Sequence, residues 1–177
     1  MNIRHATLQD LPTIVAIYNS TIPGRMVTAD LEPVTTENRL VWFDDHDPSR
    51  RPLWVVENDT HKVIAWMSFS DFSERAAYNI TAEISIYIDP AARGNGLGSL
   101  LLQYAIDQAP SLGIQKLLGK IFAHNEPSIK LFEKFGFNQW GNLPDVCLLD
   151  GILRSVLILG RSTPYTEGSS FPNSNSL

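Results

Sequence analysis

The residues best suited to chemistry form a short glycine-rich run, Arg93-Gly94-Asn95-Gly96-Leu97-Gly98. It follows a β-rich segment that stops at Asp89-Pro90, and it precedes apolar residues that recur at helical spacing. Glycines let a ligand approach the main chain closely. The first N–H groups of a helix lack partners inside the helix and favour negative charge. The run therefore predicts a cradle for phosphate or pyrophosphate, although a plain strand-to-helix turn has the same pattern.

Two familiar phosphate-binding motifs fit this run poorly. A P-loop ends in Gly-Lys-Ser/Thr, whereas Ser99 and Leu100 follow Gly98. A dinucleotide fingerprint needs glycine or a small apolar residue in the place of Ser99, and a carboxylate at the end of the next strand. That strand ends at Ala123-His124, with no carboxylate. The missing lysine excludes the first motif, and the missing acid disfavours the second.

The elements expected to position the run alternate between strands and helices. An edge strand over 2–6 precedes helices near Leu8–Tyr18 and over Thr35–Asp45. We expect strands at 53–57, 63–69, 83–88 and 116–122, helices after Leu97 and Asn125, and a hairpin of 146–149 with 152–159 around Asp150-Gly151. Candidate core residues of the helices are Leu40, Val41, Phe43, Leu100, Leu101, Tyr104 and Ala105. This order predicts an α/β fold, with a mixed sheet and helices on both faces.

Composition sets the wider limits. The 177 residues, 44% of them hydrophobic, suit one domain, which we place over 1–161. Residues 162–177 are rich in Ser, Pro, Asn and Gly and predict a poorly ordered tail. A net charge of -5 gives no protein-wide field for nucleic acid. The single cysteine, Cys147, excludes an intrachain disulfide and suggests a small buried hydrophobe. Without a signal-peptide pattern or a bilayer-length apolar run, we expect a cytoplasmic protein with no membrane or nucleic-acid partner.

Two motifs carry a family resemblance. Arg93, Gly96 and Gly98 match the acetyl-CoA motif of the GNAT N-acetyltransferase superfamily, and Asn125 and Ser128 open the helix of its second motif, which ends in Gly-Phe at 136–137. Within that superfamily the chain resembles the phosphinothricin acetyltransferase-like group. The stretches that carry this narrower resemblance are Ile17-Tyr18-Asn19, Leu31-Glu32-Pro33, 77–83 and 84–90. The resemblance implies the GNAT fold, a mixed, mostly antiparallel sheet, and acetyl-CoA as co-substrate without a metal.

The resemblance also implies how acetyl-CoA binds. The strand at 86–88 would hydrogen-bond the pantetheine arm through its backbone, the main chain of 94–99 would hold the pyrophosphate, and Arg93 would lie beside that charge. Asn125 and Ser128 would flank the pantetheine or adenosine end. Asn125 can also cap its helix, because a cap uses the side-chain oxygen and leaves the amide nitrogen free. The implied cofactor-binding residues are Ile86, Tyr87, Ile88, Arg93, Gly94, Asn95, Gly96, Leu97, Gly98, Ser99, Asn125 and Ser128.

Glu83 takes the position of the catalytic glutamate in the phosphinothricin acetyltransferase-like group. Direct transfer needs a neutral amine, so the resemblance implies that Glu83 is the general base; the alternative is an ion pair with Arg75 or another basic residue. A backbone N–H near Tyr87 or Ile88 would stabilise the oxyanion. Phe132 stands where many relatives carry a proton-donating tyrosine. Because phenylalanine cannot donate a proton, we expect its ring to pack in the core.

The acceptor is less constrained. The resemblance implies a small-molecule amine, such as an amino acid or an analogue like phosphinothricin or methionine sulfone. Two alternatives remain: the acceptor is a protein or peptide amine, or the chain is a non-catalytic module that binds acetyl-CoA. Arg75, Tyr78 and Asn79 are the candidate substrate residues, although Asn79 replaces an arginine that relatives use to pair a carboxylate. Arg25, Met26 and His124 are further pocket candidates. Family analogy implies a homodimer through the C-terminal strands.

Overall fold

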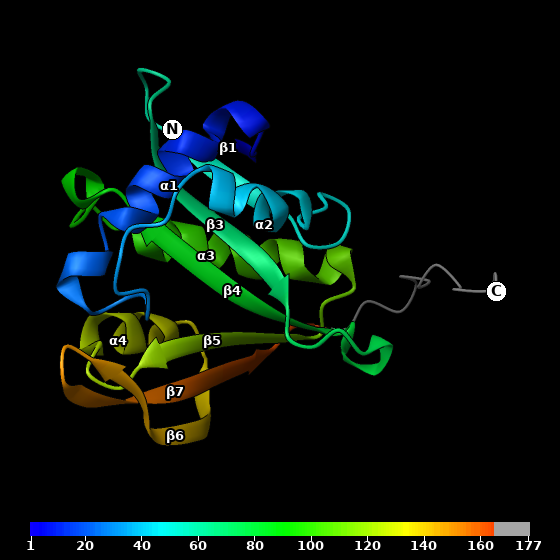
Figure 1. Cartoon of the computed structure of the whole chain (residues 1–177). Coiled ribbons are helices and arrows are strands. Elements are labelled where there is room, and N and C mark those ends of the chain that lie inside the picture. The colour runs from blue at the N-terminus through cyan, green and yellow to red at the C-terminus, as the bar shows by residue number, and fades with distance from the viewer. Residues whose placement is uncertain (165–177) are drawn as a thin grey trace.

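A computed structural model describes residues 1–164 around a seven-stranded sheet in the order β1-β2-β3-β4-β5-β7-β6 (Figure 1). The strands are β1 (Asn2–His5), β2 (Leu53–Glu57), β3 (Val63–Asp71), β4 (Thr81–Ile88), β5 (Lys116–Phe122), β6 (Asn138–Leu149) and β7 (Ile152–Ser162). The helices are α1 (Leu11–Asn19), α2 (Leu40–Asp44), α3 (Leu97–Gln108) and α4 (Glu126–Lys134). Only β4 and β5 pair in parallel among the described strands. This confirms the predicted mixed, mostly antiparallel sheet.

The two faces of the sheet carry different helices, because successive strand residues point to opposite sides. On β2, Val55 packs in a core with α1, whereas Trp54 and Val56 pack in a core with α3. On β4, Tyr87 joins the α1 side and Ile84 joins the α3 side. The α4 helix shares the core of α3. The prediction of helices on both faces is confirmed.

The parallel pair β4–β5 separates partway along its length. Pairing runs only from Thr81 opposite Lys116 to Glu83 opposite Leu118. Beyond that point β4 continues to Ile88 beside β3, while β5 stays paired with β7. Figure 1 shows the two strands diverging. The edge of β4 that faces β5 therefore has no strand partner in this structure from Ile84 to Ile88, and Glu83 lies at the apex of the opening.

Several local predictions are confirmed at the residue level. Asn125 caps α4, because its side-chain oxygen accepts a hydrogen bond from the Ser128 N–H. Gly136 adopts a left-handed conformation after that helix, with φ of 77°. Asp150 and Gly151 join β6 to β7 with positive φ angles of 47° and 80°. These features depend on short-range backbone chemistry, which the sequence displays directly.

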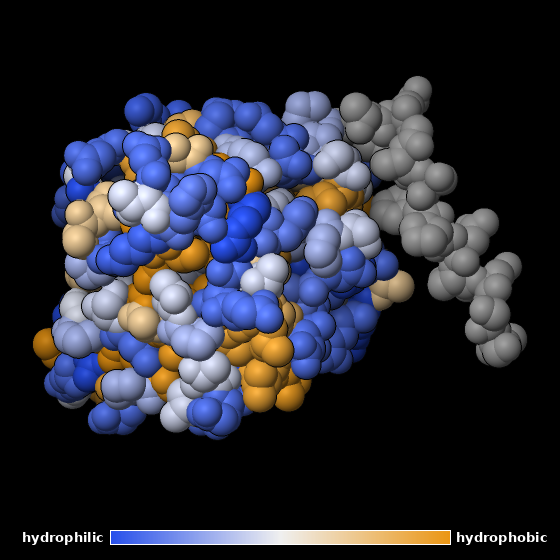
Figure 2. All heavy atoms as spheres, turned by 90° about the horizontal axis from the view of Figure 1, so that it is seen from above, coloured by the Kyte–Doolittle hydropathy of each residue, from blue (hydrophilic) through white to orange (hydrophobic). Residues whose placement is uncertain are grey.

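Other local predictions need correction. The helix expected over 35–45 is a one-turn 3₁₀ helix (Glu37–Arg39) followed by the short α2. Val41 is 73% exposed and Leu40 is 40% exposed, because α2 turns Trp42 toward Trp66 of the sheet, with ring centroids 5.5 Å apart. Phe43 packs only partly buried. The face with α1 and α2, seen from above in Figure 2, is mainly hydrophilic with apolar groups between the polar ones.

In α3 and at the C-terminal end, three further expectations differ from the structure. Leu100 is 45% exposed, since α3 buries Leu101 and its neighbours instead. Cys147 is only half-buried. The expected tail begins too early, because Ser162 ends β7 and the buried Thr163 hydroxyl donates to the carbonyl oxygen of Ile114. Residues 165–177 lie outside the described part of the chain. None of the helices within 1–164 combines the length and apolar content needed to cross a bilayer.

Candidate active site

A cleft of about 770 Å³ fills the opening between β4 and β5. Its walls come from both strands, from the start of α3, from α4 and from the loop after α1. Eight of the residues predicted for catalysis or cofactor binding line it, namely Glu83, Ile86, Tyr87, Ile88, Arg93, Gly98, Asn125 and Ser128. The remaining five, Gly94, Asn95, Gly96, Leu97 and Ser99, lie in or beside the loop that joins Arg93 to Gly98. Topology thus gathers the two sequence motifs at one opening.

The glycines of the loop serve two different purposes. Gly94 and Gly96 have φ angles of 85° and 76°, and a Cβ on either would meet no atom within 4 Å. Glycine is favoured at these two positions because of the positive φ angles, since a side chain would have room there. At Gly98 a Cβ would lie 3.2 Å from a methyl group of Leu131 on α4. The absence of a side chain there lets α3 approach α4. Gly98 lines the cleft in the first turn of α3, where backbone N–H groups lack partners within the helix.

Arg93 and Asn125 are both held by the protein itself. The Arg93 Nε–H donates to the carbonyl oxygen of Ile88 at 3.1 Å, which anchors the loop to the end of β4. The buried Asn125 caps α4, and its amide nitrogen donates to the carbonyl oxygen of Met26 at 2.8 Å. The expectation that this nitrogen stays free is therefore wrong. Asn125 shapes the wall of the cleft, because it fastens the loop after α1.

That loop is fastened twice more. The His124 Nε2–H donates to the carbonyl oxygen of Arg25 at 2.8 Å. The Arg25 guanidinium reaches Asp150 in the β6–β7 turn through two bonds of 2.8 and 3.1 Å. Met26 lines the cleft, as the sequence suggested. His124 and Arg25 instead position the cleft wall through contacts between segments far apart in the sequence, which no local pattern indicates.

Glu83 lies at the apex of the opening, beside Lys120 of β5. The Glu83 Oε2 is 2.7 Å from the Lys120 Nζ, and the two side chains are 22% and 47% exposed. Both residues line the cleft. An ion pair with a basic residue was the alternative considered for Glu83; the structure contains one, with Lys120 as the partner instead of Arg75. Sequence reasoning missed Lys120, although it is the single charged residue between Leu117 and Phe122.

Phe132 is a packing residue, as expected. Its ring lies 4.8 Å from that of Phe137, and 6% of the residue is exposed. The ring also covers Gly119 of β5, where a Cβ would lie 2.5 Å from the ring carbon Cε1. Gly119 therefore makes room for the aromatic side chain, and this position has no hydroxyl that could donate a proton.

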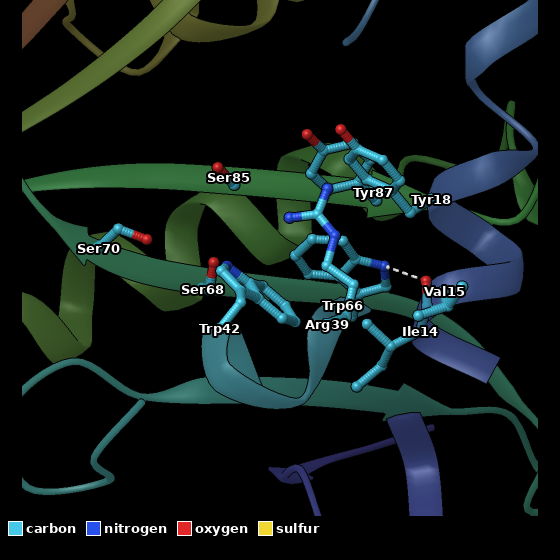
Figure 3. Close-up of a pocket in the computed structure, with 10 residues that line it drawn as sticks. All are labelled: Ile14, Val15, Tyr18, Arg39, Trp42, Trp66, Ser68, Ser70, Ser85 and Tyr87. Carbon is cyan, nitrogen blue, oxygen red and sulfur yellow. Dashed lines mark hydrogen bonds between the residues drawn. The ribbon is translucent and has the colours of Figure 1, made fainter. Parts of the chain in front are cut away.

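A second, smaller cavity of about 170 Å³ adjoins the cleft on the α1 and α2 side (Figure 3). Ser85 and Tyr87 line both cavities. We call this cavity the side pocket; its lining is Ile14, Val15, Tyr18, Arg39, Trp42, Trp66, Ser68, Ser70, Ser85 and Tyr87.

The floor of the side pocket follows the β3–β4 register. Trp66 lies opposite Tyr87, Ser68 opposite Ser85, and Ser70 opposite Glu83. Directly paired residues share one face of an antiparallel sheet. Along the strands, the floor therefore passes from the aromatic pair to the serine hydroxyls and ends at the Glu83 carboxylate, at the apex of the cleft.

Arg39 and Tyr18 form the wall of the side pocket opposite this floor. The Arg39 guanidinium lies 4.6 Å from the Tyr18 ring centroid and 5.6 Å from that of Trp42, and its Nη2 is 3.2 Å from Asp30. The Tyr18 hydroxyl donates to Asp30 at 2.6 Å. Burial raises the pKa of Tyr18 and, more strongly, of Tyr87, so both phenols stay protonated near neutrality. Arg39 ends the one-turn 3₁₀ helix Glu37–Arg39, and no motif in the sequence indicates a role for it.

The three predicted substrate residues lie in the loop before β4, outside both cavities. Arg75 and Tyr78 are exposed. The Asn79 side-chain oxygen accepts from Arg50 at 3.0 Å, and its carbonyl oxygen accepts from Arg51 at 2.8 Å. In this structure Asn79 therefore ties the loop to two arginines. No group of three or more His, Cys, Asp or Glu within 1–164 is arranged to hold a metal ion.

Comparisons with known proteins agree on one family. The model of the acetyltransferase (GNAT) family matches residues 14–137. The chain is 56% identical over 161 residues to the "Putative phosphinothricin acetyltransferase YwnH" of Bacillus subtilis, covering 91% of this chain and 98% of that one. It is 33% identical to an L-methionine sulfoximine/L-methionine sulfone acetyltransferase of Pseudomonas aeruginosa, covering 82% and 84%. A crystal structure of a phosphinothricin acetyltransferase from Sinorhizobium meliloti in complex with acetyl-CoA superposes with a TM-score of 0.88 at 26% identity, covering 98% and 96%.

Proposed function

The chain belongs to the acetyltransferase (GNAT) family, and we propose that it acetylates the α-amine of a free amino acid or a close analogue. It is an acetyl-CoA-dependent N-acetyltransferase that acts on small-molecule amines. One observation carries the finer proposal. The side pocket is small, and its floor of paired residues leads to Glu83 at the apex of the acetyl-CoA cleft. Such a pocket suits a compact acceptor better than a folded protein surface.

In the proposed complex, acetyl-CoA occupies the cleft between β4 and β5. The unpaired edge of β4 at 86–88 hydrogen-bonds the pantetheine arm as an added strand would. The loop and first turn of α3 (94–99) bind the pyrophosphate through main-chain N–H groups, with Arg93 beside them. Ser128 and the wall held by Asn125 flank the pantetheine or adenosine end. This arrangement places the thioester beside the apex of the opening, where Glu83 lies.

The proposed reaction is direct transfer. Glu83 accepts a proton from the acceptor ammonium, and the neutral nitrogen attacks the thioester carbonyl carbon. A backbone N–H near Tyr87 or Ile88 stabilises the oxyanion of the tetrahedral intermediate. The C–S bond then breaks, the nitrogen loses its second proton to water as the amide forms, and coenzyme A leaves as a thiolate. Because Phe132 has no acidic proton, water protonates the thiolate after it leaves.

A substrate panel tests the acceptor class. We expect the protein to release coenzyme A thiol with phosphinothricin or L-methionine sulfone, the acceptors named for its relatives, and to do so far more slowly with polyamines and peptide N-termini. A thiol-reactive dye measures the release. Acetylation of peptides alone would contradict the small-acceptor proposal. Acetyl-CoA binding without thiol release on any amine would favour a non-catalytic binding module.

We also propose that two copies associate through the β6–β7 hairpin. Val146, Leu148, Ile152 and Leu153 are each more than half exposed there, and β6 is an edge strand of the sheet. A monomer seldom leaves such a cluster open to water, and one face that meets its own copy closes a symmetric dimer. The cytoplasmic location stays a prediction from the sequence.

Sedimentation velocity tests this association. We expect the wild-type protein to sediment as a dimer and Leu148→Asp to sediment as a folded monomer, because a carboxylate buried in an apolar interface without a partner is costly. Val41→Asp is the matched control, since Val41 is also exposed but lies on α2, away from the hairpin. A wild-type monomer at micromolar concentration would contradict the dimer, as would an unchanged dimer in the Leu148 variant.

A further inference from the structure

Glu83 and Lys120 place two opposite charges side by side at the reacting end of the cleft. Their carboxylate and ammonium are 2.7 Å apart on neighbouring strands, and each side chain keeps part of its surface open. An α-amino acid carries the complementary pair, an ammonium and a carboxylate attached to one carbon atom. Such a zwitterion can lie across the pair with each charge facing its opposite, which leaves the set of four charges neutral.

We infer that Lys120 binds the α-carboxylate of the acceptor while Glu83 holds its amine, an inference that rests on the proposed amino-acid acceptor. Lys120 then determines specificity for α-amino acids over simple amines. Lys120 would then replace the carboxylate-binding arginine that the family resemblance implies near the position of Asn79.

The other cationic side chains around the cleft lie away from Glu83 or are paired with other groups. The cationic residues that line the two cavities are Arg39, Arg93 and Lys120. Arg93 lies at the glycine loop and donates to Ile88. Arg39 lies on the far wall of the side pocket, against Asp30. Of these three, Lys120 alone contacts Glu83, so it is the cation placed to meet a carboxylate adjacent to the reacting amine.

Two arginines outside the cavities are also occupied. Arg50 and Arg51 both pair with Asp71, with nitrogen–oxygen distances of 2.8 and 2.7 Å. Arg51 is buried and also donates to the carbonyl oxygen of Asn79. Both arginines therefore hold the loop before β4 in place, and neither lines the cleft or the side pocket.

The side pocket fits the rest of the same molecule. From the Glu83–Lys120 pair, an amino-acid side chain would pass the hydroxyls of Ser70 and Ser85 toward Arg39 (Figure 3). Hydroxyl and guanidinium donors suit an oxygen-rich terminal group, such as a sulfone or an acid. A polyamine would instead bring a second cation toward Lys120 and Arg39, and like charges repel.

The test compares acceptors that differ only at the carboxylate. L-methionine sulfone, its carboxamide and its decarboxylated amine are assayed with wild type, Lys120→Met and Lys120→Arg. We expect Lys120→Met to raise KM for the amino acid about 10- to 100-fold, the range for a lost charge-assisted hydrogen bond. KM for the carboxamide and the amine should change little. Lys120→Arg should restore most of the preference for the amino acid.

Lys116→Met is the control, because Lys116 lies on the same strand but its Nζ donates to Ser162 outside the cleft. An equal fall in kcat for all three acceptors in Lys120→Met would overturn the inference and make Lys120 a positioning residue for Glu83. An unchanged KM for the amino acid would overturn it as well. If the wild-type protein acetylates neither these three compounds nor phosphinothricin, the proposed amino-acid acceptor fails, and the role of Lys120 fails with it.

Discussion

Glu83→Gln should lower the acetyl-transfer rate at saturating substrates by about 10²- to 10⁴-fold, the usual contribution of a general base. Glutamine has nearly the same shape and still offers an oxygen to Lys120, so the apex of the cleft should keep its structure. The residual rate should rise with pH, because solution then supplies more neutral amine. Thiol release at saturating acetyl-CoA and acceptor, followed across pH, measures both effects.

Glu126→Gln is the matched control for this substitution. Glu126 is an exposed glutamate on α4 that also pairs with a lysine, Lys130, at 3.1 Å, but it does not line the cleft. We expect its variant to keep the wild-type rate. A Glu83→Gln protein as fast as wild type at every pH would remove the base role. Glu83 would then be only the partner of Lys120.

Phe132→Ala should lower the free energy of unfolding by about 3–5 kcal/mol, as removal of a buried phenylalanine typically does. The ring packs between Phe137 and Gly119, so its loss opens a cavity under the second motif helix. Urea unfolding followed by tryptophan fluorescence measures the change. Acetyl-CoA affinity should fall as well, since Phe132 lines the cleft.

Gly119→Ala provides a second measurement of the same contact. Its added Cβ would lie 2.5 Å from the Phe132 ring, so the single variant should lose about 1–3 kcal/mol through overpacking. In the Phe132→Ala background this cost should largely disappear, because the ring is gone. Strict additivity of the two substitutions would contradict the packing role assigned to Phe132.

The two cavities differ in the side chains that line them. The cleft, which we propose for the donor, is bounded by motif residues, whereas the side pocket, which we propose for the acceptor, is lined mainly by aromatic, serine and arginine side chains. Ser85 and Tyr87 line both, and Glu83 lies where the pocket floor meets the cleft. The two cavities therefore meet at β4, where this strand diverges from β5.

The motifs that we assign to the donor site could be recognised in the sequence because their backbone chemistry is local. The positive φ angles of Gly94 and Gly96, the cap made by Asn125 and the left-handed Gly136 each depend on a few neighbouring residues. Their order along the chain was enough to indicate a strand, an anion-binding turn and a second motif helix. The alternation of apolar residues likewise indicated the strands and the placement of helices on both faces.

The surroundings of the proposed acceptor site depend on contacts between distant parts of the chain. Glu83 meets Lys120 because a parallel register sets their strands side by side, and Arg25 meets Asp150 across most of the chain. Arg39 reaches the side pocket through the packing of a short helix against Trp66. Such contacts depend on strand register and helix placement over long sequence separations, and those follow from the packing of the whole core. Local sequence motifs therefore identified acetyl-CoA as the donor, whereas the pairing of strands and helices built the side pocket that we propose for the acceptor.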